Sequence, residues 1–485
     1  MLEDKNKDID QKINPQKENI NKKPKRKKHY LQSRLFFLTL AIGCILGLML
    51  PLRPTKSEVE KRNLSEFPKL TAKSFVDGEF FNKLALWYAD TFPFRDKLIS
   101  LNTQAKSLYG IKDTQIVTNT KKTADDIPDE IPNDKKDDDK KDGKDTKLSE
   151  AEKKEKEKKD KLEAEKALEE NLDDGTIFDK PEVAGDVYIT GDRGFSLYYF
   201  NKKGADMYIA LLDKIQEQLP GVNVYDIIAP TGVGIVLDEK VQEEIGSSNQ
   251  KKAIEYIESG IKEKNPKVKV VNPFDKLKKH NAEYLYFRTD HHWTQLGAYY
   301  TYLEFCRAKG IDPVKLEDKE KVEFKGFVGT LYSSSNQAPA LKKNPDKVVA
   351  YKNKNTNKMM YVDDNGEEID WPIVADVNGW SAGTLYSTFI GGDHMFTVMD
   401  NPKLDNGKNA VFIKESYGNA FAPFLLDHYD KVFVIDYRYF YKYDKYNNDL
   451  VRFIKENSVE DVILLNNAEA ITQLRIKQMN SMFSK

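Results

Sequence analysis

With 485 residues, the chain is long enough for two or three domains and for a sizeable buried core. Its formal net charge of −1 combines 77 basic with 78 acidic residues, which are unevenly distributed along the sequence. A nucleic-acid-binding protein is expected to carry a basic face on its folded part, which this composition does not indicate. We therefore expect no nucleic-acid partner.

The first predicted element is a transmembrane helix. Residues 1–34 are rich in Lys, Asn and Asp, end in a dense basic run, and are expected to form a disordered tail. The segment 35–52 has no charged residue and, as a helix, reaches roughly 27 Å, close to the thickness of a bilayer's hydrocarbon core. Because the Lys/Arg excess precedes this segment, the positive-inside rule places the tail in the cytoplasm and the following chain outside.

The apolar segment is less typical of a cleaved signal or of a lipoprotein signal. A cleaved signal peptide is disfavoured because no A-x-A site follows it. A lipoprotein signal around Cys44 is disfavoured because the apolar run continues well beyond that residue. The second cysteine, Cys306, belongs to the predicted folded part, so an intramolecular disulfide is not expected. An exported chain without disulfides is typical of a bacterial surface protein, and the abundance of Lys, Asn, Ile and Tyr suggests a Gram-positive source.

After this segment, residues 53–118 show helical periodicity and are assigned to an N-terminal helical part. Its motif DTFPFRD predicts a structural ion pair between Asp90 and Arg95. Residues 119–175 consist mainly of Lys, Asp and Glu, and we interpret them as a charged linker or insertion. Within them, opposite charges spaced three and four residues apart predict a lone solvated helix.

From residue 176 to 485, short β-like runs alternate with helical patterns. Near-continuous runs of Val, Ile, Leu and Phe between amphipathic helices favour a parallel sheet covered on both faces. The predicted fold class is therefore α/β with three layers. Residues 320–400 are more irregular and predict a β-rich excursion. The candidate strands are GDVYIT, NVYDIIAPTGVGIV, KVKVVNP, YLYFRT, KNAVFIKES, KVFVIDYRY and DVILLNN.

The segment FRTDHHWTQLGAYY carries a candidate general base. A strand is predicted to end near Thr289, and Thr294 suits the N-cap of a following helix. Asp290 and His292 are two residues apart, so their side chains leave the same face of an extended segment. A carboxylate in that position holds the imidazole and stabilises imidazolium. We therefore predict a base and its orienting acid at a strand's carboxyl end, where open α/β sheets build their sites.

The segment NAVFIKESYGNAFAPFLL carries a candidate nucleophile, Ser416, between a strand and a helix. No G-x-S-x-G motif is present. Ser416 alone is as often a helix N-cap, and its pairing with the aspartate and histidine favours a catalytic role. The backbone N–H groups of Ser416, Tyr417 and Gly418 are predicted to stabilise an oxyanion at the helix N-terminus. Tyr417 and Asn419 are also candidate donors to substrate, and Gly392 is a candidate cleft residue.

Together, the motifs DHHW (290–293), KESYGN (414–419), EKRNLSEFP and DTFPFRD resemble those of the DHHW protein family, which is related to AlgJ/AlgX-type alginate O-acetyltransferases and to SGNH hydrolases. The resemblance covers most of residues 56–118 and 180–480. It implies an SGNH hydrolase-like fold with a circularly permuted order of catalytic motifs. The charged insertion, and Glu415 where an aspartate is expected, depart from the family pattern.

The resemblance also implies roles for the residues and partners for the chain. Asp290 is the implied orienter, His292 the general base and Ser416 the nucleophile. The implied reaction transfers an acetyl group, through a serine ester and without a cofactor, to a hydroxyl of a cell-surface polysaccharide. A membrane-bound O-acyltransferase is the implied acetyl donor, and the single membrane helix holds the serine near it.

The same residues are also compatible with functions other than acetyl transfer. Asp290, His291 and His292 are typical metal-ligand types, but no further His or Cys cluster supplies more ligands, and we expect no metal. An inert helix cap with core neighbours is a further possibility. His291 is expected to be a hydrogen-bonded neighbour and Trp293 to pack beneath the loop. The same three catalytic residues also suit a carbohydrate esterase, and a non-catalytic glycan-binding surface protein is the third alternative.

Overall fold

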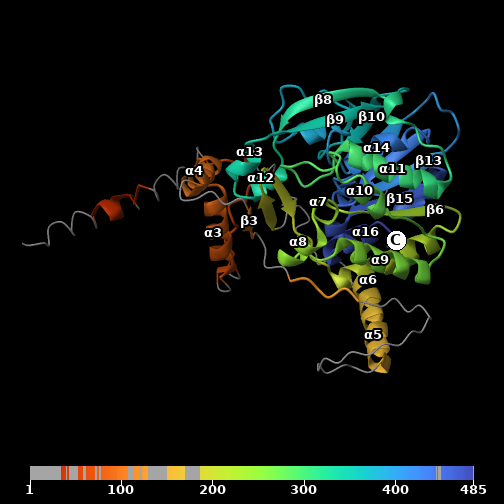
Figure 1. The fold of residues 1–485 in the computed structure, drawn as a ribbon, viewed down its shortest axis with the longest axis horizontal. Coiled ribbons are helices and arrows are strands. Elements are labelled where there is room, and N and C mark those ends of the chain that lie inside the picture. The colour runs from red at the N-terminus through yellow and green to blue at the C-terminus, as the bar shows by residue number, and fades with distance from the viewer. Residues whose placement is uncertain are drawn as a thin grey trace, which may run out of the picture. The chain divides into compact units, whose positions relative to one another are not determined.

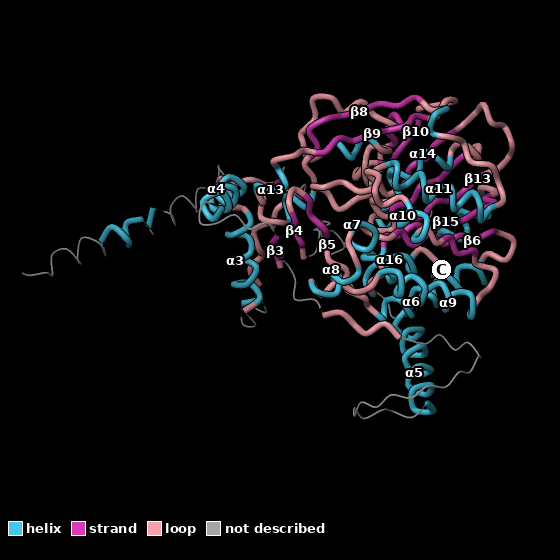
Figure 2. The backbone as a smooth tube through the Cα atoms, in the orientation of Figure 1, coloured by secondary structure: helices cyan, strands magenta, loops and turns pink. Residues whose placement is uncertain are grey.

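The computed structural model describes the residues 34–39, 41–42, 53–57, 62–71, 74–75, 78–107, 114–118, 123–128, 150–169, 186–443, 445 and 449–483 (Figures 1 and 2). These residues belong to two compact parts. The smaller part lies within residues 1–55 and 64–95, and the larger one within residues 56–63 and 96–485.

The smaller part contains helix α3 (Glu79–Asp90), as the helical periodicity predicts. The Arg53 guanidinium lies 3.9 Å from the ring centroid of Trp87, a cation–π contact. Asp90 accepts a hydrogen bond of 2.8 Å from the Ser65 backbone, and its carboxylate lies 4.0 Å from Arg95 Nε. The predicted ion pair between Asp90 and Arg95 is thus confirmed.

The predicted membrane span lies mostly beyond the described residues. Residues 34–39 and 41–42 are helical, whereas 40 and 43–52 lie outside the described residues. Among the helices that the structure describes, none combines the length and apolar character that crossing a bilayer requires. The span at 35–52 therefore stays a prediction.

The larger part is built on an eight-stranded sheet with the order β11-β10-β12-β14-β13-β15-β6-β7. The run from β14 to β7 is parallel, whereas β12, β10 and β11 continue the sheet in antiparallel pairing. The fold is thus mixed α/β with a mostly parallel central sheet. Its strands are β6 (Asn223–Ala229), β7 (Lys269–Val271), β10 (Lys358–Val362), β11 (Glu368–Pro372), β12 (Phe396–Asp400), β13 (Asn409–Lys414), β14 (Lys431–Asp436) and β15 (Val459–Asn467).

Helices cover both faces of this sheet, which gives the three predicted layers (Figure 1). The central strands β13 and β15 are buried over nearly their whole length, as expected for parallel strands between helical layers. One layer holds α10 (Phe274–Lys279), α11 (Gln295–Lys309) and α14 (Gly418–Leu425); the other holds α6 (Lys202–Gln218), α9 (Gln250–Lys264) and α16 (Gln473–Ser481). Further helices are α4 (Arg95–Ser107), α7 (Gly232–Val236), α8 (Glu239–Glu244), α12 (Thr330–Ser334), α13 (Pro339–Lys342), α15 (Leu450–Glu456) and the 3₁₀ turns η2 (Leu316–Asp318), η3 (Leu385–Thr388), η4 (Phe440–Lys442) and η6 (Ala468–Ala470).

The prediction is wrong for two segments that were assigned to strands of the parallel sheet. GDVYIT forms β4 (Val187–Thr190), which pairs antiparallel with β3 (Thr114–Val117) and β5 (Arg193–Ser196) in a separate sheet. A tight turn with Gly191 in the left-handed region joins β4 to β5, and such a hairpin leaves no room for the crossover that a parallel pair needs. YLYFRT forms no regular strand, for the reason given with the site below.

The β-rich excursion at 320–400 is confirmed. It contains β8 (Glu320–Phe327) and β9 (Asp346–Lys352), which pair with each other, and then β10 to β12 of the central sheet. A further pair is formed by β1 (Lys56–Ser57) and β2 (Arg62–Asn63).

The charged segment contributes helix α5 (Glu150–Glu169), so the predicted helix is confirmed but its isolation is wrong. Ala164, Ala167 and Leu168 are at most 3% exposed and belong to the main core. Their spacing of three and four residues gives α5 a narrow apolar stripe, which packs on α6. The assignment of 119–175 as a linker or insertion stays a prediction, since 129–149 and 170–185 lie outside the described residues.

Candidate active site

The loop that carries Asp290 and His292 is shaped by a distant carboxylate. Buried Asp346, at the start of β9, accepts hydrogen bonds from the backbone N–H of Arg288 (3.1 Å) and of Thr289 (2.8 Å). These N–H groups therefore do not enter a strand ladder, and the segment forms only an isolated bridge between Tyr286 and Trp293. The strand predicted before Asp290 is absent for this reason.

The helix predicted after the loop is confirmed. Helix α11 begins at Gln295, and the Thr294 hydroxyl accepts a bond of 3.5 Å from the Gly297 backbone N–H as its N-cap. The main chain thus turns sharply between two fixed points, the Asp346 carboxylate and the N-terminus of α11. This turn directs Asp290 and His292 inward, and both are at most 6% exposed.

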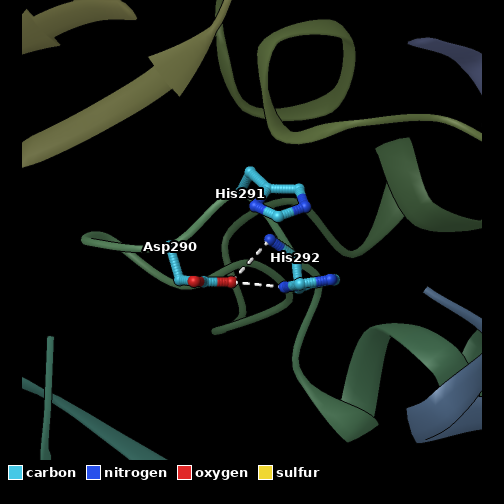
Figure 3. A group of neighbouring side chains, drawn as sticks. All are labelled: Asp290, His291 and His292. Carbon is cyan, nitrogen blue, oxygen red and sulfur yellow. Dashed lines mark hydrogen bonds and ion pairs between the residues drawn. The ribbon is translucent and has the colours of Figure 1, made fainter. Parts of the chain in front are cut away.

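Asp290, His292 and Ser416 form one hydrogen-bonded chain. Asp290 Oδ1 lies 2.5 Å from His292 Nδ1 and accepts a second bond of 3.0 Å from the His292 backbone N–H (Figure 3). On the other side of the ring, His292 Nε2 lies 2.7 Å from Ser416 Oγ. The carboxylate therefore favours the tautomer with hydrogen on Nδ1, which leaves Nε2 to accept the serine proton.

The second oxygen of Asp290 is held by the start of α12. Its Oδ2 accepts bonds from Thr330 N (2.8 Å) and Thr330 Oγ1 (3.0 Å). The preceding Gly329 lies so close that a Cβ there would fall 2.1 Å from Oδ2. Only glycine permits this approach, so the carboxylate is fixed from both sides.

Ser416 lies on the turn between β13 and α14, as predicted. Buried Glu415 holds this turn, because its Oε2 accepts from Tyr417 N (3.1 Å) and its Oε1 from Asn467 N (2.9 Å) at the end of β15. Gly418 permits the close contact between strand and helix, since a Cβ there would lie 2.5 Å from Lys414 Cβ.

The same turn contains the residues of the predicted oxyanion site. Tyr417 N donates to the Glu415 side chain, and Gly418 N donates to the Glu415 carbonyl at 2.9 Å. The Asn419 N–H likewise donates to the Ser416 carbonyl, at 3.2 Å. In this conformation the N–H groups of Tyr417 and Gly418 are engaged within the turn. The oxyanion role of these two residues stays a prediction.

Tyr386, which the sequence did not single out, packs against the His292 imidazole. Its ring stacks on His292 with centroids 4.1 Å apart and an angle of 14° between the planes. Its hydroxyl donates to the Ser416 carbonyl at 3.0 Å. Burial, and then the charge of Asp290, raise the Tyr386 pKa well above its usual value, so this phenol stays neutral. One side chain thus fixes both the ring plane and the serine turn.

The remaining predicted residues lie around these three. Trp293 is fully buried and donates from Nε1 to the Tyr417 carbonyl at 2.9 Å, so it packs beneath the loop as predicted. His291 Nδ1 lies 2.5 Å from Thr330 Oγ1, which confirms it as a hydrogen-bonded neighbour. Asn419 is buried, and its Nδ2 donates to Asp393 at 2.9 Å. Gly392 lies in the loop immediately before Asp393, with φ of 102°.

A buried charge network supports the serine turn from behind. Lys414 Nζ lies 2.8 Å from Asp436 Oδ2 and 3.0 Å from Asp393 Oδ1. Arg438 lies 2.9 Å from the second oxygen of Asp393. Burial opposes the ionisation of Asp393, but Arg438 and Lys414 outweigh it and hold the Asp393 pKa well below its usual range. No periodic pattern in the sequence predicts this network, because its members come from the ends of β13 and β14 and from the loop at Asp393.

Asp290, His291 and His292 form a group of three metal-ligand types, with ligand atoms within 4.8 Å of one another. In the part of the chain that the structure describes, this is the one such group of His, Cys, Asp and Glu. A catalytic zinc site uses three protein ligands. Here Asp290 Oδ1 is bonded to His292 Nδ1, His292 Nε2 to Ser416, and His291 Nδ1 to Thr330. This arrangement fits proton transfer better than metal binding, and the absence of a metal stays a prediction.

Comparison with known proteins gives the family. The sequence profile described as "DHHW protein" matches residues 60–435. A DHHW family protein from Eubacterium siraeum, solved by crystallography, shares 28% identity over 65% of this chain and 99% of its own, with a TM-score of 0.55. No curated protein sequence matches the chain significantly.

More distant solved structures also match. PatB1 from Bacillus cereus shares 16% identity over 58% of this chain and 94% of its own, with a TM-score of 0.48. The O-acetyltransferase domain of Pseudomonas putida AlgJ shares 13% identity over 57% of this chain and 90% of its own, with a TM-score of 0.32. The profile match over residues 60–435 confirms the predicted resemblance to the DHHW protein family. With its profile match over most of the chain and its aspartate and histidine inside the DHHW motif, this chain belongs to the DHHW protein family.

Proposed function

We propose that the chain is a serine-dependent O-acetyltransferase that transfers an acetyl group to a hydroxyl of a cell-surface polysaccharide. The observation that carries this proposal is the hydrogen-bonded chain from Asp290 through His292 to Ser416. His292 and Ser416 lie 124 residues apart in sequence, yet the imidazole Nε2 and the serine hydroxyl are 2.7 Å apart. This is the arrangement of nucleophile, base and orienting acid that acyl transfer requires.

The reaction has two halves. Ser416 Oγ gives its proton to His292 Nε2 as the oxygen attacks the acetyl carbonyl of the donor. The tetrahedral adduct collapses to a serine ester, and the imidazolium returns the proton to the leaving group. In the second half, an acceptor hydroxyl gives its proton to Nε2 and attacks the ester, after which Ser416 recovers a proton from the imidazolium. Asp290 stabilises the imidazolium in both halves.

The acceptor and donor assignments rest on the family resemblance. A polysaccharide outside the membrane is the proposed acceptor, and a membrane-bound O-acyltransferase is the proposed acetyl donor. The predicted helix at 35–52 is the proposed anchor, with residues 1–34 in the cytoplasm. Anchoring raises the local concentration of Ser416 at the membrane surface, where the donor works.

The test uses the full-length protein in detergent, with 4-nitrophenyl acetate as donor and a neutral oligosaccharide as acceptor. Acetylated sugar, detected by mass spectrometry, is expected from the wild type and is expected to disappear in Ser416→Ala. The matched control is Ser381→Ala at an exposed serine, which is expected to transfer normally. Ester cleavage that needs Ser416 but never yields acetylated sugar identifies an esterase instead. Equal inactivity of Ser416→Ala and the wild type contradicts the transferase and favours the third alternative, a non-catalytic glycan-binding protein.

A further inference from the structure

We propose that Trp371 and His394 form a binding subsite for a hydroxyl group of the acceptor glycan, beside the serine turn. The indole Nε1–H and the imidazole Nε2 supply one donor and one acceptor that meet at Gly391. This subsite rests on the proposed function for the identity of its ligand, and on the local geometry for its existence.

The first observation is that both nitrogens are buried and face the same backbone position. Among the described residues, neither Trp371 Nε1 nor His394 Nε2 has a hydrogen-bond partner. A Cβ placed on Gly391 would lie 2.9 Å from His394 Nε2 and 3.2 Å from Trp371 Nε1, so the two atoms converge on one face of this glycine. Buried polar atoms in native proteins are rarely left unpaired, and such a pair indicates a ligand position.

The second observation is strain in the loop that presents Gly391. Ile390, Gly391 and Gly392 have φ values of 46°, 71° and 102°, three consecutive left-handed residues. A β-branched residue such as isoleucine adopts this conformation only when its surroundings impose it. Ile390 is buried, and its N–H donates to the Ile373 carbonyl at 2.8 Å, which holds the loop in place. Strain of this kind is concentrated at ligand-binding sites.

The third observation is the aromatic setting of the two nitrogens. Tyr361 on β10 and Trp371 on β11 lie diagonally on one face of the sheet, because Met359 pairs with Trp371 and Tyr361 with Ile369. The His394 ring stacks on Tyr361 with centroids 3.6 Å apart. Tyr361, Trp371 and His394 are half-buried residues, whereas the two nitrogen atoms themselves are buried.

The chemistry of the two nitrogens selects the ligand. In the proposed subsite the ring hydrogen of His394 lies on Nδ1, so that the unpartnered Nε2 carries a lone pair. Burial, together with the charge of Lys414, lowers the His394 pKa to about 4 and keeps the ring neutral at physiological pH. An indole nitrogen only donates. A neutral donor next to a neutral acceptor matches a hydroxyl, which accepts from one and donates to the other. An anion or a cation satisfies only one of them.

The subsite is joined to the serine turn. Asp393, the neighbour of His394, accepts from Asn419 Nδ2 at 2.9 Å and from Lys414 Nζ at 3.0 Å. Lys414 and Asn419 lie on either side of Ser416 in sequence. The loop that carries the proposed subsite is thus hydrogen-bonded, through Asp393, to two residues that flank Ser416.

The test measures binding to the full-length Ser416→Ala protein, in which no acyl transfer complicates the result. Cellotetraose, N-acetylchitotetraose and mannotetraose are titrated by calorimetry, with tetragalacturonate as an anionic comparison. Trp371→Phe and His394→Phe keep the aromatic rings and remove the nitrogens. Each is expected to weaken binding of a neutral tetrasaccharide roughly fivefold, because each removes one neutral hydrogen bond. Trp380→Phe, at a tryptophan that is 40% exposed, makes the same chemical change elsewhere and is expected to leave the affinity unchanged.

The outcomes separate this subsite from the proposed function. Four results overturn the subsite. They are unchanged affinity in both variants, an equal loss of affinity in Trp380→Phe, binding of the anionic sugar alone, and no binding of any neutral sugar. Binding that depends on both nitrogens, in a protein that never transfers acetyl groups, supports the subsite and refutes the transferase. If acetyl transfer occurs and the KM for the acceptor is the same in the wild type, Trp371→Phe and His394→Phe, the transferase is supported and the subsite is refuted. Melting temperatures equal to that of the parent show that the variants fold.

Discussion

The Asp290 carboxylate uses both of its oxygens. One binds the ring and the backbone of His292, and the other binds Thr330. Such a carboxylate sets the position of the hydrogen on the imidazole as well as its orientation. The side chain is nearly fully buried, so no water competes for these bonds.

Asp290→Asn tests this role. An asparagine amide donates to Nδ1 and moves the ring hydrogen to Nε2, where it faces Ser416 and prevents proton abstraction. We expect kcat for ester cleavage to fall by roughly 10⁴ with little change in KM. Asp364→Asn, whose side chain is 88% exposed, is the control and should behave as the wild type. A loss of less than tenfold would show that the carboxylate only supports the loop.

A second buried carboxylate, Asp226 in β6, gives a prediction about pH. Burial raises its pKa from 3.8 to about 7, and Tyr208 donates to it at 2.5 Å. Because the folded pKa lies above the unfolded value, the folded state holds a proton that the unfolded state releases. The protonated Asp226 carboxyl therefore contributes to the free energy of unfolding. This contribution is fully present below about pH 4 and is lost as the pH rises through 7.

Asp226→Asn removes this pH dependence. The amide cannot ionise, so the variant avoids a penalty on the order of 2–4 kcal/mol that the wild type has above pH 7. We expect the difference in melting temperature between variant and wild type to shift in favour of the variant, by several degrees, from pH 5 to pH 8. Thermal unfolding across this range measures it. A difference that is the same at both pH values contradicts the assignment.

At the scale of elements, the close contact between β13 and α14 places Ser416. Gly418→Ala would put a methyl group 2.5 Å from Lys414 Cβ and 3.1 Å from Phe412 Cε1, so the helix start must move away from the strand. A displacement of about 1 Å at a reacting group costs on the order of 10²-fold in rate. We expect a loss of that size in ester cleavage. Gly221→Ala is the control, because a Cβ at Gly221 meets no atom within 4 Å.

Helix α5 gives the second prediction at this scale. Ala164 is 1% exposed against the core, whereas Leu162, two residues earlier, is 51% exposed. Ala164→Glu places a charge in the interface with α6 and is expected to lower the melting temperature and speed hydrogen exchange over residues 150–169. Leu162→Glu on the solvated side is expected to do neither. Equal hydrogen-exchange rates in both variants would contradict the packing of α5 on α6 and would support the solvated helix that the charge pattern predicts.

At the scale of the whole molecule, the anchor and the side of the membrane remain proposals. We expect the full-length chain to fractionate with membranes and to resist extraction by carbonate, and a chain lacking residues 35–52 to be soluble. Protease added to intact cells is expected to cleave the larger part and to spare residues 1–34. Recovery of the full-length chain in the soluble fraction would refute the anchor.

Local patterns in the sequence predicted much of the fold. Apolar runs such as 410–414 predicted buried parallel strands, because period and composition reflect burial on both faces. The Thr294 N-cap and the helix at 295–309 followed from side-chain chemistry within one turn. The strand predicted at 284–289 failed, because its N–H groups are bound by Asp346, which is distant in sequence. Local propensity contains no information about such a partner.

The candidate site likewise depends partly on local sequence and partly on contacts between distant segments. The sequence by itself determined which residues have the chemistry: an aspartate and a histidine two apart, a serine after a buried strand, and the family to which these motifs belong. Only the tertiary structure decided that His292 and Ser416 are 2.7 Å apart, that Tyr386 packs on the imidazole, and that Glu415 occupies the N–H of Tyr417. Motif spacing reports which side chains share a face of one element. Distances between elements depend on how the sheet orders its strands, and β15 lies between β13 and β6 through contacts that no local stretch of sequence specifies.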